Sequence, residues 1–254
     1  MSGLGEIALI RGLSYLSESQ AAIAHNLANV TSVGYQRRIL IAKSIGQDFN
    51  EVLEGRYPTT RYSEFYDLSQ GTPNPTGSSN HVALQGKQLL KVVAGNGSMF
   101  FTRNGQLQIN SDRHLVTNGG HKILDDQGQP IVIQGVESTS AALGRMKINP
   151  NGQITIKPTN TDPEIRVGRM GVFEVPDPTQ LAPAGNGLFS YPDIGRIRAV
   201  PTDTIVQGAL EQSNVEPTTE LINMILAQRG FSASMKALTT LGRIKETYIT
   251  SLSR

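Results

Sequence analysis

Apolar residues recur at steps of three and four over about the last forty residues, the period of one helix face. The repeat begins at Pro217 and meets no later proline, and glycine interrupts it only at Gly230 and Gly242. Its apolar positions are Met224, Phe231, Met235, Leu238, Leu241, Tyr248, Ile249 and Leu252. The pattern predicts an amphipathic helix that begins at Pro217, because proline is well tolerated at the first helical position. A continuous helix to Leu252 would be about 54 Å long and would need a partner.

A second apolar stripe lies at the other end of the chain. Its positions alternate steps of four and three, close to the seam of a coiled coil. They are Leu9, Leu13, Leu16, Gln20, Ile23, Leu27 and Val30, with Leu4 and Ile7 as candidates to extend the stripe. We expect this helix to end near Ser32 or Val33, because Gly34 can take the left-handed conformation that closes a helix. The two terminal helices can bury their stripes against each other or against other copies of the chain.

Asn26 and Asn29 fall in the last turns of the predicted N-terminal helix, although asparagine is a poor helix former. Two interpretations follow. The helix end is rich in capping groups, or the two side chains make specific polar contacts that dock a subunit.

Sustained periodicity is lost between residues 36 and 79, where glycine and proline recur. Short apolar patches at 39–41 and 62–68 form brief strands or pack against a neighbour. A structureless loop of this length is unusual inside a compact domain, so we interpret residues 36–79 as an extended connector.

From residue 80 to residue 210 the pattern changes to short alternating strands separated by tight turns such as 95–97, Asn104-Gly105, Asn118-Gly119, Asn151-Gly152 and Asn186-Gly187. The expected strands are 82–84, 89–93, 99–102, 107–109, 114–116, 131–133, 146–148, 154–156 and 171–175. The fold class is therefore a mainly β central domain with long N- and C-terminal α-helices that form a paired, coiled-coil-like α domain. We assign residues 1–35 and 211–254 to the helical assembly domain and residues 80–210 to a β-rich outer domain.

Composition narrows the classes of partner. Charged residues are 17% of the chain and the net charge is only +2, which argues against nucleic acid and anionic membrane surfaces as partners. The apolar run 7–10 is far shorter than a signal-peptide core or a spanning helix, so we expect neither membrane insertion nor a cleaved secretory signal. Cysteine is absent, which excludes disulfides and thiolate metal sites.

No pattern of catalytic or ligand-binding residues emerges. The four histidines lack metal-ligand spacing, residues 125–128 lack the ligands of a calcium loop, and residues 185–190 do not complete a dinucleotide fingerprint. Nucleophile elbows and phosphate loops are also missing. We therefore predict no catalytic, cofactor-binding or metal-binding residues, and no enzyme.

Five segments carry a family resemblance. Residues 26–35, NLANVTSVGY, resemble the asparagine-rich N-terminal signature of flagellar basal-body rod and hook proteins. Residues 207–215, QGALEQSNV, and 224–231, MILAQRGF, are similar to that family's C-terminal helix and the segment that opens it. Residues 82–86 and 101–105 resemble its β domain. The sequence departs from the family at Leu89-Leu90, where two phenylalanines are usual, at Gly230, where alanine is common, and at Tyr35, where phenylalanine is frequent.

The resemblance implies a structural subunit of the bacterial flagellar rod, the drive shaft that transmits torque across the periplasm. In that family the paired helices line the inner layer of a tube and the β domain faces outward. The implied partners are other rod subunits, copies of the same chain, and the flagellar type III export apparatus, which would pass the chain unfolded and without a cleaved signal. Residues 47–79 resemble the proximal-rod subunit more than the distal one. The alternatives are a distal-rod or hook-type protein of the same family, or a surface β-rich binding module with oligomerising helical ends.

The mechanism that we predict is assembly by coupled folding. Ordering a residue costs about 1 to 2 kcal/mol, so each stripe should stay largely disordered until neighbouring subunits supply apolar surface. The contact stripe would consist of Leu16, Ile23 and Leu27 with Phe231, Met235 and Leu238. The whole expected assembly interface is Leu9, Leu13, Leu16, Ile23, Asn26, Leu27, Asn29, Val30, Met224, Phe231, Met235, Leu238, Tyr248 and Ile249.

Overall fold

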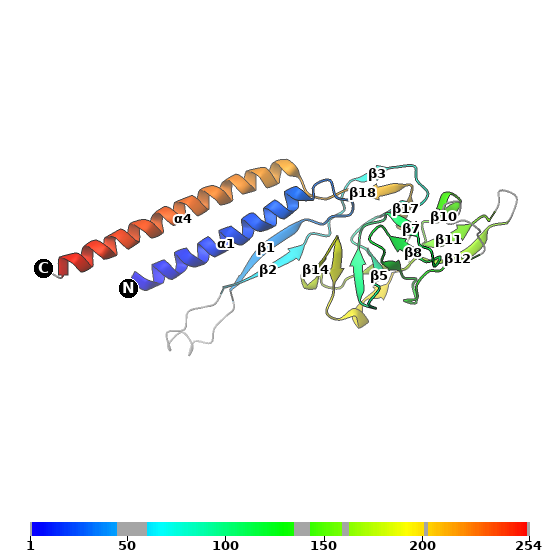
Figure 1. The fold of residues 1–254 in the computed structure, drawn as a ribbon, viewed down its shortest axis with the longest axis horizontal. Coiled ribbons are helices and arrows are strands. Elements are labelled where there is room, and N and C mark those ends of the chain that lie inside the picture. The colour runs from blue at the N-terminus through cyan, green and yellow to red at the C-terminus, as the bar shows by residue number, and fades with distance from the viewer. Residues whose placement is uncertain (1, 45–59, 135–142, 159–162, 201–202, 253–254) are drawn as a thin grey trace. The chain divides into compact units, whose positions relative to one another are not determined.

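A computed structural model describes residues 2–44, 60–134, 143–158, 163–200 and 203–252. It is mainly β, with one helix near each end of the chain (Figure 1). The chain divides into two compact units. The first comprises Met1–Ala28, Arg38–Glu64 and Glu216–Arg254, and the second comprises Asn29–Arg37 and Phe65–Val215. The boundaries of these units differ from those expected from the sequence. Arg38–Glu64, which was expected to belong to the connector 36–79, falls in the same unit as the helices.

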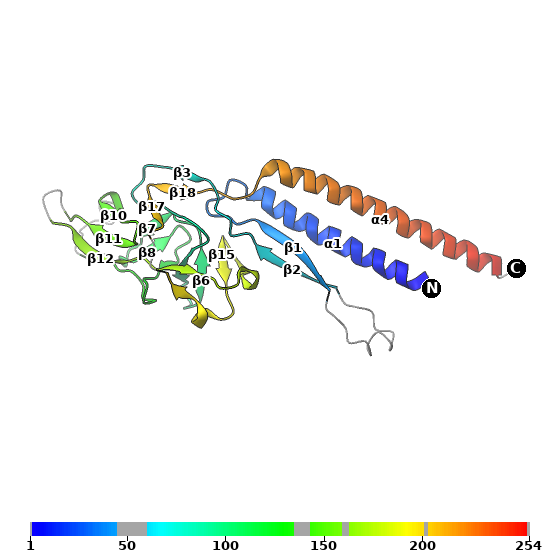
Figure 2. The same ribbon diagram turned by 180° about the vertical axis from the view of Figure 1, so that it is seen from behind.

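The first unit is built from two helices and a two-stranded sheet. Its elements are α1 (Ser2–Ala28), α4 (Pro217–Leu252), β1 (Arg38–Ser44) and β2 (Thr60–Tyr66), the last of which continues into the second unit. The helices lie side by side in both views (Figures 1 and 2). They are antiparallel, because Lys245 pairs with Glu6 whereas Gly230 lies against Leu16.

The C-terminal helix begins at Pro217 and continues through Gly230 and Gly242, which confirms the prediction. Just before its start, the Glu216 carboxylate accepts a hydrogen bond of 2.8 Å from the Thr219 hydroxyl. This contact orders the first turn, where the backbone N–H groups have no helical partner.

The N-terminal helix ends at Ala28, so the predicted end near Ser32 or Val33 is wrong. Asn26 explains part of the difference, because its side chain accepts from the Arg38 backbone N–H at 2.9 Å and donates to the Arg38 carbonyl at 3.0 Å. Beyond the helix, Ser32 donates from its hydroxyl to the Asn29 side chain at 3.0 Å and from its N–H to the Asn29 carbonyl at 3.1 Å. The two asparagines thus replace helical hydrogen bonds, Asn26 with bonds to the more distant Arg38 and Asn29 with bonds to the nearby Ser32.

The second unit contains a nine-stranded sheet and three smaller ones, all with antiparallel pairing. The large sheet runs in the order β14-β15-β6-β5-β9-β8-β7, with β13 paired to β5 and β16. Its strands are β5 (Leu89–Val93), β6 (Met99–Thr102), β7 (Leu107–Ile109), β8 (Leu115–Thr117), β9 (Lys122–Ile123), β13 (Val172–Glu174), β14 (Ala182–Gly185), β15 (Leu188–Ser190) and β16 (Arg198–Ala199).

The smaller sheets pair β10 (Met146–Ile148), β11 (Gln153–Ile156) and β12 (Ile165–Arg169); β4 (Val82–Leu84) with β17 (Ile205–Gln207); and β3 (Pro73–Pro75) with β18 (Ala209–Glu211). Two 3-10 turns, at Pro178–Gln180 and Ile194–Arg196, complete the unit.

Most of the predicted strands are confirmed, and the patches at 39–41 and 62–68 do form strands. The strand predicted at 131–133 is wrong, because only Val132 forms a bridge there, with His114. Gly105, predicted to lie in a tight turn, is not among the positive-φ residues of the described chain. Glycine is required there because a Cβ would lie 1.8 Å from the Val82 carbonyl oxygen.

The large sheet buries apolar side chains on both faces. Leu90 belongs to one core cluster, with Val92 and Ile154, whereas Leu89 belongs to another, with Phe101 and Phe189. Successive residues of a strand point to opposite faces, so the adjacent leucines fill the two cores. This explains why apolar residues stand next to each other in this strand, at Leu89-Leu90 and Val92-Val93, instead of alternating with polar ones.

Candidate assembly surface

The residues expected to form the assembly interface have different environments. Within α1, Ile23 and Asn26 are buried, whereas Leu9, Leu13, Leu16 and Leu27 are half-buried. Within α4, Met224, Phe231 and Leu238 are half-buried, and Met235, Tyr248 and Ile249 are exposed. Asn29 and Val30 are half-buried but lie beyond the end of α1, in the second unit.

The helix pair has little core of its own. Among the described side chains of α1 and α4, the only buried apolar ones are Ala22, Ile23 and Ala227. Asn26 and Glu220 are buried as well, but they are polar. Two of the three buried apolar side chains are alanines, so the larger apolar side chains of the two helices are mostly only half-buried.

The first turns of α4 carry an outer strip of large apolar residues that the sequence analysis missed. Leu221, Ile222, Ile225 and Leu226 are each between 50 and 59% exposed. A helix turns by about 100° per residue, so Ile225 points about 160° away from the buried Ala227. The same face becomes polar further along, at Ser232, Lys236, Thr239 and Arg243. The apolar outer strip is therefore densest at the start of the helix, and further along the same side Ile244, at the angular position of Leu226, is also exposed.

Other contacts join the elements of the first unit. The Tyr62 hydroxyl of β2 donates to the Arg11 carbonyl of α1 at 2.7 Å, and the Tyr15 and Tyr62 rings lie 5.6 Å apart. Lys245 of α4 and Glu6 of α1 form an ion pair at the surface. The tyrosine contacts join α1 to the sheet, whereas the ion pair joins α1 to α4 and, because it is exposed, contributes little stability.

A buried ion pair lies in the second unit. Arg103 Nε donates to Glu211 Oε2 at 2.8 Å, and both side chains are fully buried. The other carboxylate oxygen accepts from the Gly71 N–H at 3.0 Å and from Gln36 Nε2 at 3.3 Å. Arg103 also donates to the Gly86 carbonyl at 2.6 Å. Burial raises the pKa of Glu211 above its ordinary value, against the opposing effect of the Arg103 guanidinium and the hydrogen bonds from Gly71 and Gln36.

The same cluster fixes the chain segments that lead out of α1 and into α4. Asn214 Oδ1 accepts from the Arg37 N–H at 2.7 Å, and its Nδ2 donates to the Asp67 carbonyl at 2.7 Å. Gly34 donates its N–H to the Glu211 carbonyl at 2.8 Å, in a left-handed conformation with φ of 66°. A Cβ on Gly34 would lie 2.6 Å from the Arg103 carbonyl carbon. Glycine is therefore needed at position 34 because the Arg103 backbone lies so close. It does not close α1, contrary to the prediction.

Among the described residues, histidines and carboxylates do not gather into a group able to hold a metal ion. In the same part of the chain, neither helix combines the length and apolar character needed to cross a bilayer.

Comparison with known proteins identifies the family. Residues 206–252 match the model "Flagellar basal body rod FlgEFG protein C-terminal", and residues 83–175 match "Flagellar hook protein FlgE/F/G D1 domain". A flagellar basal-body rod protein FlgG of Buchnera aphidicola is 30% identical over 253 residues, covering 90% of this chain and 92% of its own. FlgF of Caulobacter vibrioides is 27% identical, covering 91% of each chain, and FlgF of Salmonella typhimurium is 30% identical, covering 87% of each.

Rod proteins of both names match at similar identity, and the matches extend from the β strands into the C-terminal helix. The chain therefore belongs to the flagellar basal-body rod protein family, whose members are structural subunits of the rod.

Proposed function

We propose that this chain polymerises into the flagellar rod through a coiled-coil-like pair of α1 and α4 that docks on the helices of neighbouring subunits. The observation that carries the proposal is the outer strip of Leu221, Ile222, Ile225 and Leu226, which stays exposed after α4 has met α1. The occupant of the strip is the helix pair of another rod subunit or another copy of this chain. Burying one such side chain fully contributes about 1.5 to 3 kcal/mol, so several strips in a stack make a stable shaft.

Coupled folding accompanies this polymerisation. Ordering the helices costs about 1 to 2 kcal/mol for each residue, and the apolar side chains of the pair, most of which are only half-buried, offset only part of that cost. We infer that the helices are largely disordered in the dilute monomer and form at the growing tip. The other half-buried and exposed apolar residues of the predicted interface complete the contact.

The contact between subunits is heterologous, because the outer strip of one copy meets a different surface of the next. Repeated along a helical array, such a contact builds a tube that can transmit torque. In this arrangement residues 1–35 and 211–254 act as the assembly domain and residues 80–210 as the outer domain. The chain works as a structural element and performs no catalysis.

The location follows from the same proposal. The chain would leave the cytoplasm through the flagellar type III export apparatus, without a cleaved signal and without membrane insertion, and take its place in the basal body. The proximal position predicted from residues 47–79 stays a prediction, because residues 45–59 lie outside the described residues.

The experiment uses cells in which the only copy of this chain carries Ile225→Asp. We expect rods isolated from these cells to lack the variant, because a carboxylate cannot be buried in an apolar contact without a partner. Thr239→Asp is the matched control, since Thr239 lies on the same outer side of α4 but in its polar part. Normal incorporation of Ile225→Asp, or equal loss of both variants, contradicts the proposed surface.

A further inference from the structure

The outer face of the β10-β11-β12 sheet concentrates positive charge. In the register of the three strands, Lys147 pairs with Thr155 and Thr155 pairs with Arg166, so these side chains form one row across the sheet. Met146, Ile148, Ile154 and Ile156 are buried on the opposite face, within the core. Alternation along each strand therefore turns the row of Lys147, Thr155 and Arg166 outward.

A second row lies beside the first on the same face, two residues along each strand. It contains Arg145, Lys157 and Glu164, of which Lys157 and Glu164 form an exposed ion pair at 3.9 Å. The two rows together hold four cationic side chains and one carboxylate, a net charge of three, whereas the whole chain carries only +2. Such a local excess of one sign attracts ligands of the opposite sign.

The face is also hollowed around an unusual hydroxyl group. A cavity of about 240 Å³ is lined by Arg145, Lys147, Thr155, Lys157 and Glu164. Thr155 is only 7% exposed, and within the described part of the chain its Oγ1 has no hydrogen-bond partner. A buried hydroxyl that lacks a partner costs free energy, so this position is unfavourable for stability alone.

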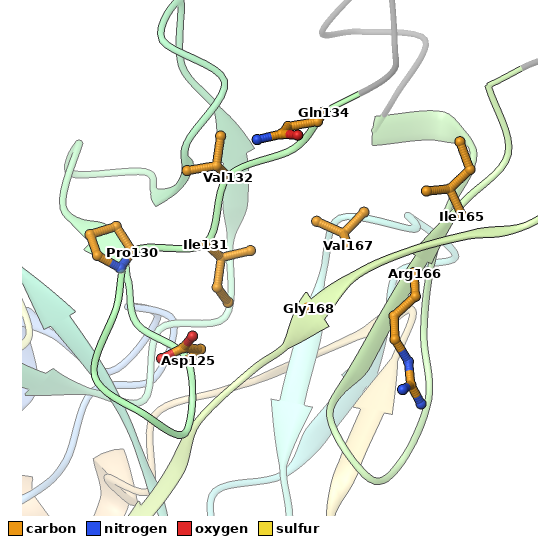
Figure 3. A pocket seen from close by; sticks show the side chains of 9 residues that line it. All are labelled: Asp125, Pro130, Ile131, Val132, Gln134, Ile165, Arg166, Val167 and Gly168. Atoms are coloured by element: carbon orange, nitrogen blue, oxygen red, sulfur yellow. The ribbon is translucent and has the colours of Figure 1, made fainter.

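A neighbouring cavity of about 350 Å³ has different chemistry. It lies between β12 and residues 130–134, and its walls include the apolar side chains of Ile131, Val132, Ile165 and Val167 (Figure 3). The Arg166 side chain extends away from Val132 and Gln134 in this view (Figure 3). Arg166 nevertheless lines this cavity and not the one at Thr155, with which it is paired in the strand register.

We propose that the outer face of β10-β11-β12 binds an oxyanion, either a carboxylate or a phosphate group, held by Thr155 and Lys147 in the cavity that they line. The Thr155 hydroxyl donates the hydrogen bond that it lacks in the free chain. The Lys147 ammonium supplies a mobile point charge, and Arg145 and Lys157, which line the same cavity, add to its positive potential. These residues belong to the second unit and take no part in the helical contacts proposed for polymerisation, so a partner with carboxylate or phosphate groups would be recruited independently of rod assembly.

The test is thermal unfolding of the full chain in phosphate and, in a parallel arm, in citrate, with ionic strength held constant by sodium chloride. A ligand that binds only the folded state raises Tm in proportion to its affinity, and the arm with the larger rise distinguishes phosphate from carboxylate. Thr155→Val should raise Tm without anion, because it removes the unpartnered hydroxyl, yet weaken anion binding about tenfold. Lys147→Gln should weaken binding by a similar factor without affecting folding, since its side chain is exposed.

Lys87→Gln is the matched control, because Lys87 is an exposed lysine of the same unit outside this sheet. It should leave the anion dependence of Tm unchanged. The proposal is overturned if Lys147→Gln binds anion as the parent chain does, or if Lys87→Gln weakens binding equally. An unchanged Tm of the parent chain in both arms overturns it as well.

Discussion

Arg103 and Glu211 form a fully buried ion pair with 2.8 Å between Nε and Oε2. Arg103 follows β6, whereas Glu211 ends β18, shortly before the C-terminal helix. Because Gln36 also donates to Glu211, the pair joins the segment that follows α1 to the segment that precedes α4. The ion pair therefore anchors, within the second unit, the segment that follows α1 and the segment that precedes α4.

Glu211→Gln should lower the free energy of unfolding of the second unit by about 3 to 5 kcal/mol, because it leaves the Arg103 cation buried without a counter-charge. Urea unfolding of the full chain followed by circular dichroism measures this change, since the chain has no tryptophan to report it. The double variant Arg103→Met/Glu211→Gln should recover part of the loss, because it removes the unpaired charge. A double variant that is no more stable than Glu211→Gln would contradict this explanation.

Asn214→Ala should destabilise the second unit by about 2 to 3 kcal/mol, because it removes several hydrogen bonds that contribute about 1 kcal/mol each. The lost partners are the Arg37 N–H and the carbonyls of Asp67 and Ser69. Hydrogen exchange of the Arg37 amide should become faster. Asn96→Ala is the control, since exposed Asn96 accepts only from the Ser98 N–H in a turn, and it should cost less than about 1 kcal/mol.

Gly34→Ala should lower the stability of the second unit far more than Gly77→Ala does, although both glycines have positive φ. The left-handed conformation alone costs an alanine about 1 to 2 kcal/mol. At Gly34 the new methyl group would also lie within 2.7 Å of the Arg103 backbone, whereas no heavy atom lies within 4 Å at Gly77. Equal losses of stability in thermal unfolding would show that the close approach is unimportant.

Gly230→Leu should disrupt the packing of α4 on α1, whereas Gly242→Leu should not. A Cβ on Gly230 would lie 3.4 Å from both Leu16 methyl groups, and nothing lies within 4 Å of one on Gly242. Gly230→Ala fits this space and should gain up to about 1 kcal/mol of helix propensity. Helical circular dichroism of assembled rods distinguishes these variants, and an equal effect of both leucine substitutions would argue against the helix pair.

The sequence predicted α4 well because its start depends on local chemistry: Pro217 suits a first helical position, and the apolar repeat continues beyond it. The end of α1 was missed because it depends on a contact between Asn26 and Arg38 that spacing does not reveal. β12 was also missed, since Ile165–Arg169 includes two arginines and a glycine and its pairing with β11 shifts register.

The candidate surfaces were predictable only in part. Leu221, Ile222, Ile225 and Leu226 repeat at helical spacing, but they lie on the side of α4 away from the longer stripe on which the prediction was based. Arg103 and Glu211 are too far apart in sequence for any motif to connect them. The unpartnered Thr155 hydroxyl depends on cross-strand register, which only the fold supplies.

Electron cryomicroscopy of a basal body containing this chain, at a resolution that shows side chains, tests the central claim most directly. Polymerisation through the terminal helices predicts that Leu221, Ile222, Ile225 and Leu226 of each copy are buried against helices of an adjacent subunit. A rod in which these four side chains face solvent, with adjacent subunits joined elsewhere, would contradict the claim.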